Sequence, residues 1–458
     1  MKQHNPDRPV AALLVPDILA MLDESPANIA AETEELHPRD LADIAEALPE
    51  EKVPAFLRAL GASRAADVLE YLDEELRSNV LEEMTTSQAA ELVTAMTPDD
   101  RADVLEELEE ETAEEILSEI PAEARRETEE LLAFDPDTAG GLMTTQFVSI
   151  GRDLTIAEAL AQVRAAARTE RKDQMYAIYV LTIDRGLAGV MSLRELLAEP
   201  DDAIVGDVAR TDVVSVPATA DRAEVARITS EYDLVAVPVV DPLMRMIGVI
   251  TVDDVIDVIV EEQTEDAQKS GAVQPLDEPY FQASFWSVAR KRAGWLVVLF
   301  LGELFTAAAM RGYEDALEQA VVLTLFIPLI ISSGGNSGSQ SATLITRALA
   351  VGHVALRDVL LVLRREVGHG VLLGTLLGGI GFVSAIVGGH SSSIGLVVAV
   401  TLLLVVTAGT TVGSMLPLAL TRVGVDPAIA SSPFVASIVD VTGILIYFNV
   451  AIRLLHLE

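Results

Sequence analysis

Two acidic residues, Glu303 and Asp440, lie within long apolar stretches of the chain. An ionisable group inside a membrane span is costly, so each is by default a functional candidate. Carboxylate oxygens suit hard divalent cations, and Mg²⁺ in particular prefers oxygen ligands and keeps several of its waters. Asp440 is interpreted either as an ion ligand or as a carboxylate paired for packing. For Glu303 a proton-coupling or interface role and a structural hydrogen bond stay equally open.

Five apolar runs supply the elements that must position these carboxylates. A hydrocarbon core about 30 Å thick requires about 17–25 apolar residues per helix, so the runs predict a transmembrane domain over residues 286–458. We expect Pro328 and Pro417 to interrupt the second and fourth runs, and the second is short before its Gly-rich end. The runs are Ala293–Met310, Gln319–Ser333, Val367–Val387, Ile394–Leu420 and Phe434–Leu455.

Basic residues predict the orientation in the bilayer. Arg290, Lys291 and Arg292 precede the first span, and positive loops stay on the cytoplasmic side. This places residues 1–280 in the cytosol and the C-terminus outside, in a multi-pass protein of the cell (inner) membrane. The later inside loops then carry Arg347, Arg357, Arg364, Arg365 and Arg422, and the outside segments carry only Arg311 and Arg453.

Charge separates the chain into two halves. The 458 residues include 71 acidic and 32 basic side chains, a net charge of −39, and no cysteine. From Asp277 onward the net charge is only −1, so the first 276 residues carry −38. This excess of acid excludes ordinary nucleic-acid binding, and the lack of cysteine excludes disulfides and thiolate metal sites. No Walker lysine motif or nucleophilic triad is present, so we expect no enzymatic activity.

Residues 1–138 predict an acidic all-α domain. An apolar residue recurs every twelve positions, and turn or cap residues separate the periods. Helices of about nine residues are not stable alone, so they should stack into a superhelical array. The recurring residues are Leu48, Leu60, Leu72, Met84, Met96, Leu108 and Ile120.

Residues 139–260 contain an α/β duplication. Met143–Leu160 aligns with Ala209–Ala226, and Gly189–Ser192 aligns with Gly248–Thr251, so the first copy has about seven extra residues near 167–173. Each copy predicts the order strand, helix, strand, turn, strand, helix. The paired units resemble a tandem of CBS (cystathionine β-synthase) domains.

The order of all these parts resembles the MgtE family of magnesium channels and transporters. The resemblance rests on "GGLMT" (Gly140–Thr144), the CBS pair, an acidic connecting helix within 261–285, and two long membrane motifs. These motifs are "SGGNSGSQSATLITRALA" (Ser333–Ala350) and "VGVDPAIASSPFVASIVDVTGILIYF" (Val423–Phe448). The resemblance to this family implies a homodimer with five spans per subunit and an ion path at the two-fold axis.

The resemblance also implies site residues. The family's pore acid matches Asp440 and its Gly-Gly-Asn motif matches Gly334, Gly335 and Asn336, so two Asp440 carboxylates could hold a hydrated Mg²⁺. Cation ligands between the cytosolic domains are expected at Asp67, Asp99 and Asp103 of the helical domain, at Asp233, Asp254 and Asp257 of the second CBS unit, and at Glu262, Glu265 and Asp266 of the connecting helix. CBS pairs also bind adenine nucleotides, and Thr251 with Asp254 fits the pattern that holds a ribose, which makes ATP a weaker candidate as a regulatory ligand.

The expected function is therefore entry of Mg²⁺ into the cytosol through a membrane channel or transporter that cytosolic Mg²⁺ closes. Mg²⁺ filling the acidic clefts would relieve repulsion and draw the domains together. Two alternatives stay open: a CBS-regulated transporter of Co²⁺ or Mn²⁺, or a membrane sensor of cations or nucleotide without transport. For any single cytosolic acid, a solvated surface role is also an alternative, since an acid-rich composition can reflect the genome or a salt-adapted organism.

Overall fold

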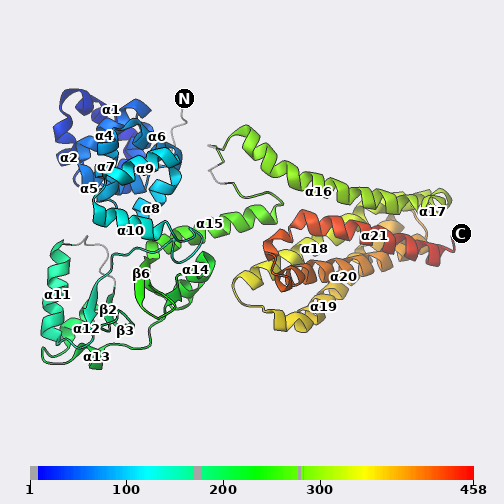
Figure 1. Ribbon diagram of the computed structural model, residues 1–458. Helices are drawn as coiled ribbons and strands as arrows, with labels where there is room; N and C mark the ends of the chain where they lie inside the picture. Colours follow the sequence, from blue (N-terminus) through cyan, green and yellow to red (C-terminus); the bar gives the residue numbers. More distant parts are fainter. Residues whose placement is uncertain (1–8, 170–176, 277–279, 282, 458) are drawn as a thin grey trace. The chain divides into compact units, whose positions relative to one another are not determined.

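The computed structural model describes residues 9–169, 177–276, 280–281 and 283–457 (Figure 1). The chain divides into two compact units, residues 1–259 and 260–458. The division falls within one long helix, α15 (Val252–Ser270).

The first unit begins with an array of short helices. The twelve-residue period is confirmed: all seven recurring residues are buried, and most of them lie at the position that ends a helix. A helix of about ten residues and a two-residue link make one period. The helices are α1 (Pro9–Glu24), α2 (Ile29–Glu32), α3 (Pro38–Ala47), α4 (Val53–Leu60), α5 (Ala62–Glu70), α6 (Glu74–Glu83), α7 (Thr86–Ala95), α8 (Pro98–Glu107), α9 (Glu110–Glu119) and α10 (Ala122–Leu131).

Stacking of these helices follows a regular rule. From α3 onward each helix packs on the helix two positions along, α3 on α5, α5 on α7, and α6 on α8. Leu41, Ile44, Phe56, Leu57 and Leu69 are fully buried in the shared core. This is the superhelical stacking that short helices need in order to bury their apolar faces.

Two three-stranded sheets of equal topology follow, which confirms the duplication. The first contains β1 (Ser149–Gly151), β2 (Ile178–Leu181) and β3 (Leu187–Met191), with α11 (Ile156–Thr169) after β1 and α12 (Leu193–Ala198) after β3. After α13 (Val205–Val208), the second contains β4 (Val216–Pro217), α14 (Arg222–Glu231), β5 (Ala236–Val240) and β6 (Met246–Thr251), and α15 follows. In both sheets the first pair is parallel and the second antiparallel. The extra residues of the first copy lie partly outside the described residues.

Within its described residues, the second unit contains five helices that are long and apolar enough to cross a membrane, which confirms the five expected helices. Between α16 and α18 lie α17 (Glu314–Gln319) and a 3₁₀ turn, Val321–Phe326. The long helices are α16 (Phe285–Arg311), α18 (Ile327–Ala350), α19 (Val359–Val387), α20 (Ser392–Arg422) and α21 (Ser432–Leu455).

The expected interruption at Pro417 is wrong, whereas the second apolar run changes from a 3₁₀ turn to an α-helix just before Pro328. Pro328 lies in the first turn of α18, where a missing N–H costs no helical bond. Pro417 lies inside α20, yet the helix continues to Arg422. The Gly-rich segment is also helical and forms part of α18. Its glycines allow the backbones of α18 and α20 to touch. A Cβ on Gly413 would lie 2.0 Å from the Gly338 oxygen, and one on Gly409 would lie 2.5 Å from the Gly334 oxygen. Small residues spaced by four bring membrane helices together in this way.

Candidate ion-binding sites

Asp440 on α21 faces residues of two other long helices. Its carboxyl group makes a hydrogen-bonding contact with that of Glu303 on α16. Gly335 of α18 lies on another side, since a Cβ placed there would be 3.8 Å from the Asp440 Oδ1. Two carboxyl groups in contact need a proton or a cation between them, because two bare charges repel. The structure therefore brings the two span carboxylates together, with the buried Gly335 beside Asp440.

The other residues of the Gly-Gly-Asn motif have different surroundings. Gly334 is buried, and a Cβ there would meet the Val405 Cγ1 at 2.5 Å and the Val439 Cγ1 at 2.8 Å. Asn336 is exposed on α18 and donates from Nδ2 to the Ser332 Oγ at 3.3 Å. The structure thus gives Gly334 a packing role, whereas Gly335 is the motif residue that lies beside Asp440.

Glu366 is a carboxylate that the sequence analysis missed. It is buried on α19, where its Oε2 accepts from the Ser341 Oγ at 2.7 Å and its Oε1 contacts the His369 Nδ1 at 3.1 Å. The Thr410 hydroxyl donates to its backbone oxygen at 3.2 Å. The third apolar run was placed from Val367, one residue too late to include it. Glu366 and His369 are three apart, which puts them on one helix face, and this spacing was the available signal.

In the first unit, two helix starts present acidic pairs to one another. Asp99 and Asp100 lie in the first turn of α8, and Asp253 and Asp254 lie in the first turn of α15. Negative side chains are favourable at helix starts, where the backbone N–H groups are free. An apolar cluster that includes Ala102, Val255 and Val258 holds the two helices in the same core.

Asp99 is the most confined of these acids. Desolvation by the surrounding protein raises its pKa, while hydrogen bonds from Thr97 and Thr144 oppose the rise. Its Oδ1 is shielded from solvent and has no hydrogen-bond partner. Thr144 is positioned by two backbone bonds of 2.9 Å with Val249, next to the second sheet. The "GGLMT" segment therefore brings a hydroxyl to Asp99.

Asp254 and Asp103 complete the centre of this cluster. Desolvation, followed by the charge of Asp99, raises the pKa of Asp254 well above its ordinary value. The same two causes raise the pKa of Asp103 to about 7, although its side chain still reaches solvent. Three predicted ligands, Asp99, Asp103 and Asp254, are thus close enough to affect one another.

Sequence reasoning missed three members of the cluster, namely Glu70, Asp100 and Asp253. The pKa of Glu70 is raised to about 8. The largest cause is desolvation of the Glu70 carboxyl group, followed by the charges of Asp100, Asp67, Asp253 and Asp99. The only signal for Glu70 was its place at the end of an acidic helix. We call Glu70, Asp99, Asp100, Asp103, Asp253 and Asp254 the α8–α15 acidic cluster.

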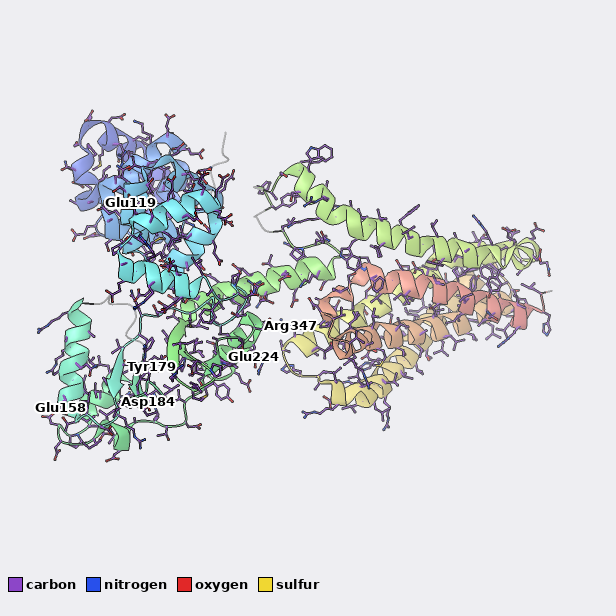
Figure 2. The ribbon with its side chains drawn as sticks, viewed as in Figure 1. Glu119, Glu158, Tyr179, Asp184, Glu224 and Arg347 are labelled. Atoms are coloured by element: carbon purple, nitrogen blue, oxygen red, sulfur yellow. The ribbon has the colours of Figure 1, made fainter. Side chains whose placement is uncertain are left out.

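The remaining predicted ligands of the first unit lie farther out. Asp67 lies close enough to act on Glu70. Partial burial and Asp253 raise the pKa of Asp257, and Arg39 opposes the rise. Asp233 is exposed after α14 in left-handed backbone, at φ 51°. Many other acids simply extend from the surface, such as Glu119, Glu158 and Asp184 (Figure 2).

The α8–α15 acidic cluster is not a finished metal centre. Within the described ranges, no three or more His, Asp or Glu side chains are arranged to hold a metal ion directly. What the cluster offers is repulsion between carboxylates and the unpartnered Asp99 Oδ1. A hydrated divalent cation suits this arrangement, because Mg²⁺ is often held through its waters by one or two carboxylates.

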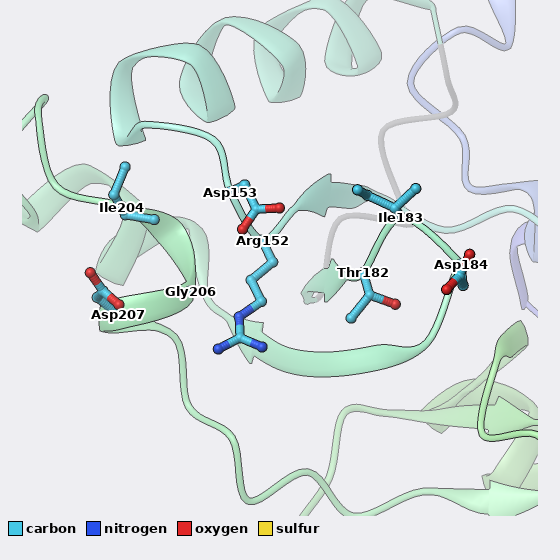
Figure 3. A pocket seen from close by; sticks show the side chains of 8 residues that line it. All are labelled: Arg152, Asp153, Thr182, Ile183, Asp184, Ile204, Gly206 and Asp207. Carbon is cyan, nitrogen blue, oxygen red and sulfur yellow. The ribbon is translucent and has the colours of Figure 1, made fainter.

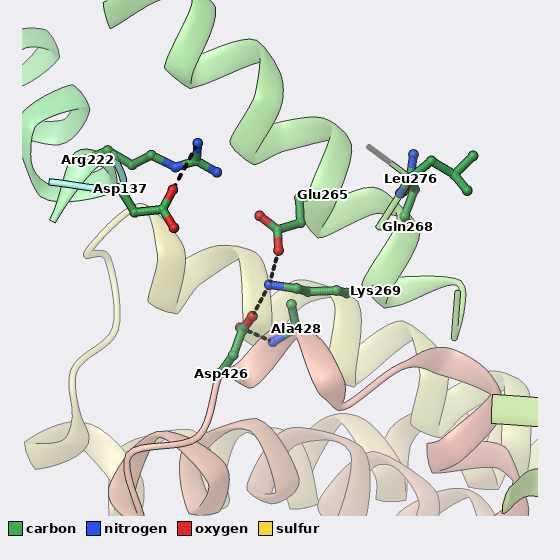
Figure 4. Close-up of polar contacts among 8 residues, drawn as sticks. All are labelled: Asp137, Arg222, Glu265, Gln268, Lys269, Leu276, Asp426 and Ala428. Carbon is green, nitrogen blue, oxygen red and sulfur yellow. Dashed lines mark hydrogen bonds and ion pairs between the residues drawn. The ribbon is translucent and has the colours of Figure 1, made fainter. Parts of the chain in front are cut away.

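The connecting-helix acids belong to the second unit. The Glu265 Oε1 and the Asp426 Oδ2 each lie 2.7 Å from the Lys269 Nζ (Figure 4). Partial burial and then Asp426 raise the pKa of Asp266, while Lys269 opposes the rise. Glu262 lies half-buried on the same helix. This second group is therefore partly neutralised by a lysine, unlike the α8–α15 acidic cluster.

The two residues predicted for nucleotide binding have a local structural role. The Thr251 Oγ1 donates to the Asp254 Oδ2 at 2.7 Å at the start of α15. Ser192 and Glu195 form a reciprocal capping box at the start of α12. Both hydroxyl-plus-acid pairs are thus capping motifs, which explains the pattern without a ligand. A nucleotide role for Thr251 and Asp254 stays a prediction.

A hollow of about 380 Å³ lies elsewhere, in the first CBS unit (Figure 3). It opens where β1 and β2 end, at the edge of the sheet opposite Ser192. Arg152 is surrounded there by three aspartates, so a phosphate would meet more negative than positive charge. The lining residues are Arg152, Asp153, Thr182, Ile183, Asp184, Ile204, Gly206 and Asp207.

Comparison with known proteins identifies the family. Residues 327–450 match the MgtE model, described as a divalent cation transporter. Residues 36–137 match the MgtE intracellular N domain, and residues 205–261 match the CBS domain. The magnesium transporter MgtE of Thermus thermophilus is 41% identical over 332 residues, which are 72% of this chain and 73% of the relative. The chain belongs to the MgtE family of magnesium transporters.

The chain is also similar to other magnesium transporters and to solved parts of such proteins. MgtE of Bacillus subtilis is 32% identical over 336 residues, 73% of each chain. The solved soluble part of a magnesium transporter is 31% identical, with a TM-score of 0.51, and covers 55% of this chain and 99% of its own. A cytosolic domain of the Mg²⁺ channel MgtE, solved in complex with ATP, is 33% identical with a TM-score of 0.48, covering 50% of this chain and 93% of its own. As an MgtE transporter-family protein, the chain is not an enzyme.

Proposed function

We propose that this MgtE protein admits Mg²⁺ to the cytosol through a path at Asp440 and closes when cytosolic Mg²⁺ binds its acidic domains. The observation that carries the proposal is the meeting of Asp440, Glu303 and Gly335 from three membrane helices. Membership of the MgtE family supports Mg²⁺ as the transported ion. The charges and contacts of the acidic residues support the candidate residues for each step.

For the pore, the proposed ligand is the Asp440 carboxylate, with Gly334, Gly335 and Asn336 lining the approach. Mg²⁺ releases its waters reluctantly, so a carboxylate that holds the hydrated ion favours passage over trapping. A ring of two Asp440 side chains requires the proposed homodimer, in which each subunit contributes five spans. Glu303 touches Asp440, and we include it in the pore as a second acid.

For the orientation, the inside face is proposed from the basic loops. Lys269 of α15 bonds to Asp426 in the loop between α20 and α21, so that loop and the end of α15 share one side. The same side carries Arg347, whose charge acts on Asp266 of α15. These contacts support a cytosolic location for residues 1–280 and an external C-terminus. The proposed domain boundaries stay at 138/139, 260/261 and 285/286.

For the gate, the proposed cation sites are Asp99, Asp103 and Asp254 with Asp67, Asp233 and Asp257, and Glu262, Glu265 and Asp266 on the connecting helix. Without cations, the close carboxylates repel one another. A cation that binds the compact arrangement better than the open one shifts the population toward it, whereas equal affinity would shift nothing. Since α15 leads toward the first membrane helix, compaction would close the path.

An adenine nucleotide is proposed as a second ligand, near Thr251 and Asp254. The relative solved with ATP motivates this choice. Because Asp254 already caps α15 and faces Asp99, a nucleotide and a cation would compete for it. Titration calorimetry with ATP in EDTA, for the intact protein and for Thr251→Ala, tests the site. Equal affinity in both proteins would remove Thr251 from it.

Mg²⁺ uptake into proteoliposomes tests the pore. The comparison is wild type, Asp440→Asn and Glu303→Gln, with Glu318→Gln as a control that removes an exposed carboxylate of α17. Asp440→Asn keeps the side-chain volume and removes the charge, so we expect Mg²⁺ flux to fall at least about tenfold, the equivalent of about 1.4 kcal/mol. Glu318→Gln should stay near wild type.

Opposite results would change the assignment. Undiminished flux in Asp440→Asn would remove Asp440 from the path. Flux of Co²⁺ or Mn²⁺ without Mg²⁺ would favour the other-cation transporter, and no flux of any divalent ion would favour a sensor. Adding Mg²⁺ on the side of the cytosolic domains should suppress wild-type flux. It should suppress flux less in Asp99→Asn than in Asp184→Asn, whose carboxylate is exposed.

A further inference from the structure

Lys269 makes two strong bonds at the end of α15. Its ammonium group lies 2.7 Å from the Glu265 Oε1, one turn earlier, and 2.7 Å from the Asp426 Oδ2 in the α20–α21 loop (Figure 4). The side chains of Lys269, Glu265 and Asp426 are only 26%, 28% and 37% exposed, respectively. All lie within the second unit. Charge-assisted bonds of this length are the stronger class of hydrogen bond.

The geometry around Asp426 leaves each oxygen with its own partner. The Asp426 Oδ1 accepts from the Ala428 N–H at 2.8 Å, which fixes the turn that precedes α21. The Oδ2 is left for Lys269. An ammonium group has three donors and no acceptor, so it can serve both carboxylates at once. Its position in the last turn of α15 is also favourable for a cation.

We propose that Lys269 is a built-in cation that attaches the end of α15 to the α20–α21 loop, in the place where a divalent cation would otherwise join Glu265 and Asp426. A tethered charge is present at all times, whereas the stabilisation by a bound ion depends on its concentration and rises with the logarithm of that concentration above the Kd. This attachment is therefore independent of Mg²⁺. Of the cation sites proposed for the gate, Glu265 is then already served by Lys269, and control by Mg²⁺ falls to the other sites, chiefly the α8–α15 acidic cluster. This consequence alone rests on the proposed function, which it narrows at Glu265.

Further bonds connect this attachment to the first membrane helix. The Gln268 Oε1 accepts from the Leu276 N–H at 2.7 Å, which folds the chain after α15 back onto the helix. The Lys291 Nζ of α16 donates to the Pro275 oxygen at 2.6 Å. A displacement of the end of α15 would thus be transmitted to α16 through residues 274–276. Lys269 is a positioning residue in this sense.

Spin-label distances in the full-length protein test the attachment. The chain has no cysteine, so Ala267→Cys on α15 and Val423→Cys in the loop can be labelled specifically. With Lys269 present, and with labelled subunits diluted by unlabelled ones, we expect one narrow distribution of the distance within a subunit by double electron–electron resonance, unchanged between EDTA and millimolar Mg²⁺. In Lys269→Met the distribution should broaden in EDTA and narrow again when Mg²⁺ is added. Asp426→Asn should also broaden it in EDTA.

Two controls separate this effect from a general loss of structure. Lys269→Arg keeps the charge and should keep the narrow distribution. Lys52→Met removes a lysine with a similar 2.7 Å ion pair, to Asp23 in the first unit, and should change nothing. An identical distribution in EDTA for Lys269→Met and wild type would overturn the proposal, as would a wild type that narrows only with Mg²⁺. Neither result depends on transport, so a failure of the proposed pore is detected separately by the flux experiment.

Discussion

Carboxylates of this chain differ by what surrounds them rather than by their residue type. Asp184 is exposed in a turn, Glu265 is paired with Lys269, and Asp99 has an oxygen that reaches neither solvent nor a donor. The lack of a hydrogen-bond partner for the Asp99 Oδ1 lowers the stability of the folded protein, because a shielded, unpaired polar atom loses its hydration. Each of these acids therefore responds differently to the removal of its charge.

Asp99→Asn should stabilise the protein in the absence of divalent cations. The change removes one of several mutually repelling charges and adds an amide that can donate to a neighbouring carboxylate. We expect a gain on the order of 1 kcal/mol, seen as a higher Tm in EDTA, together with a smaller rise of Tm on adding Mg²⁺. Scanning calorimetry of the purified protein measures both. A lower Tm in EDTA, or an undiminished Mg²⁺ response, would contradict this account, and Asp184→Asn is the control.

At the scale of elements, the membrane unit depends on close contact between α18 and α20. Gly409 and Gly413 of α20 face the backbone oxygens of Gly334 and Gly338. The motif that resembles a pore signature therefore also does the packing. Glu366 adds polar links among α18, α19 and α20. These contacts hold α18 in the register that keeps Gly335 beside Asp440.

Gly413→Ala should disrupt this packing. Its new Cβ would lie 2.0 Å from the Gly338 oxygen, which is backbone and cannot rotate away. We expect a destabilisation of about 1–3 kcal/mol and reduced Mg²⁺ flux. The matched control is Gly379→Ala on α19, where nothing lies within 4 Å of the added atom. Thermal unfolding in detergent and proteoliposome flux report the two effects, and equal behaviour of both variants would refute the close contact.

At the scale of the whole molecule, charge repulsion links stability to pH and to Mg²⁺. The pKa values of Glu70 and Asp103 in the folded protein, about 8 and about 7, lie above the ordinary values near 4. Between these limits the folded protein holds more protons than the unfolded chain. The free energy of unfolding therefore falls as pH rises through this range, and the proton-linked stabilisation is complete only below it. The side chains of both Glu70 and Asp103 reach solvent, so solvent and salt will weaken the effect.

We accordingly expect the Tm in EDTA to decrease from about pH 6 to about pH 8, and the Tm gain from Mg²⁺ to increase over the same range. The cation binds the deprotonated carboxylates and so competes with protons. Calorimetry at several pH values, with and without Mg²⁺, measures both slopes. A Tm in EDTA that rises with pH, or an Mg²⁺ response that is flat, would contradict the proposed cation cluster. Glu70→Gln should reduce both slopes.

Much of the architecture was predictable because it depends on patterns along the chain. The length of apolar runs sets the membrane helices, and a twelve-residue period reports a helix plus its link. Two copies of one strand and helix order report a duplication. Glu303 and Asp440 were recognisable for the same reason, since a charge stands out within an apolar run. Local composition also indicated capping residues between the short helices of residues 1–138. At the start of α15, the Thr251–Asp254 pair was interpreted as a nucleotide site, and the structure shows the two side chains bonded to one another there.

Which side chains meet was decided only by the tertiary structure. The approach of Asp99 to Asp254 depends on how α8 and α15 share an apolar core, and the Lys269–Asp426 bond depends on where the α20–α21 loop lies. The glycines of the Gly-rich segment pack α18 against α20, because the partner helix leaves no room for a Cβ. Sequence alone determined the helices and strands and marked the carboxylates as potential cation ligands, since both follow from neighbouring residues. Packing between distant segments determined which acids repel, which are paired and which meet within the membrane helices, since these interaction energies depend on distances that no local pattern contains.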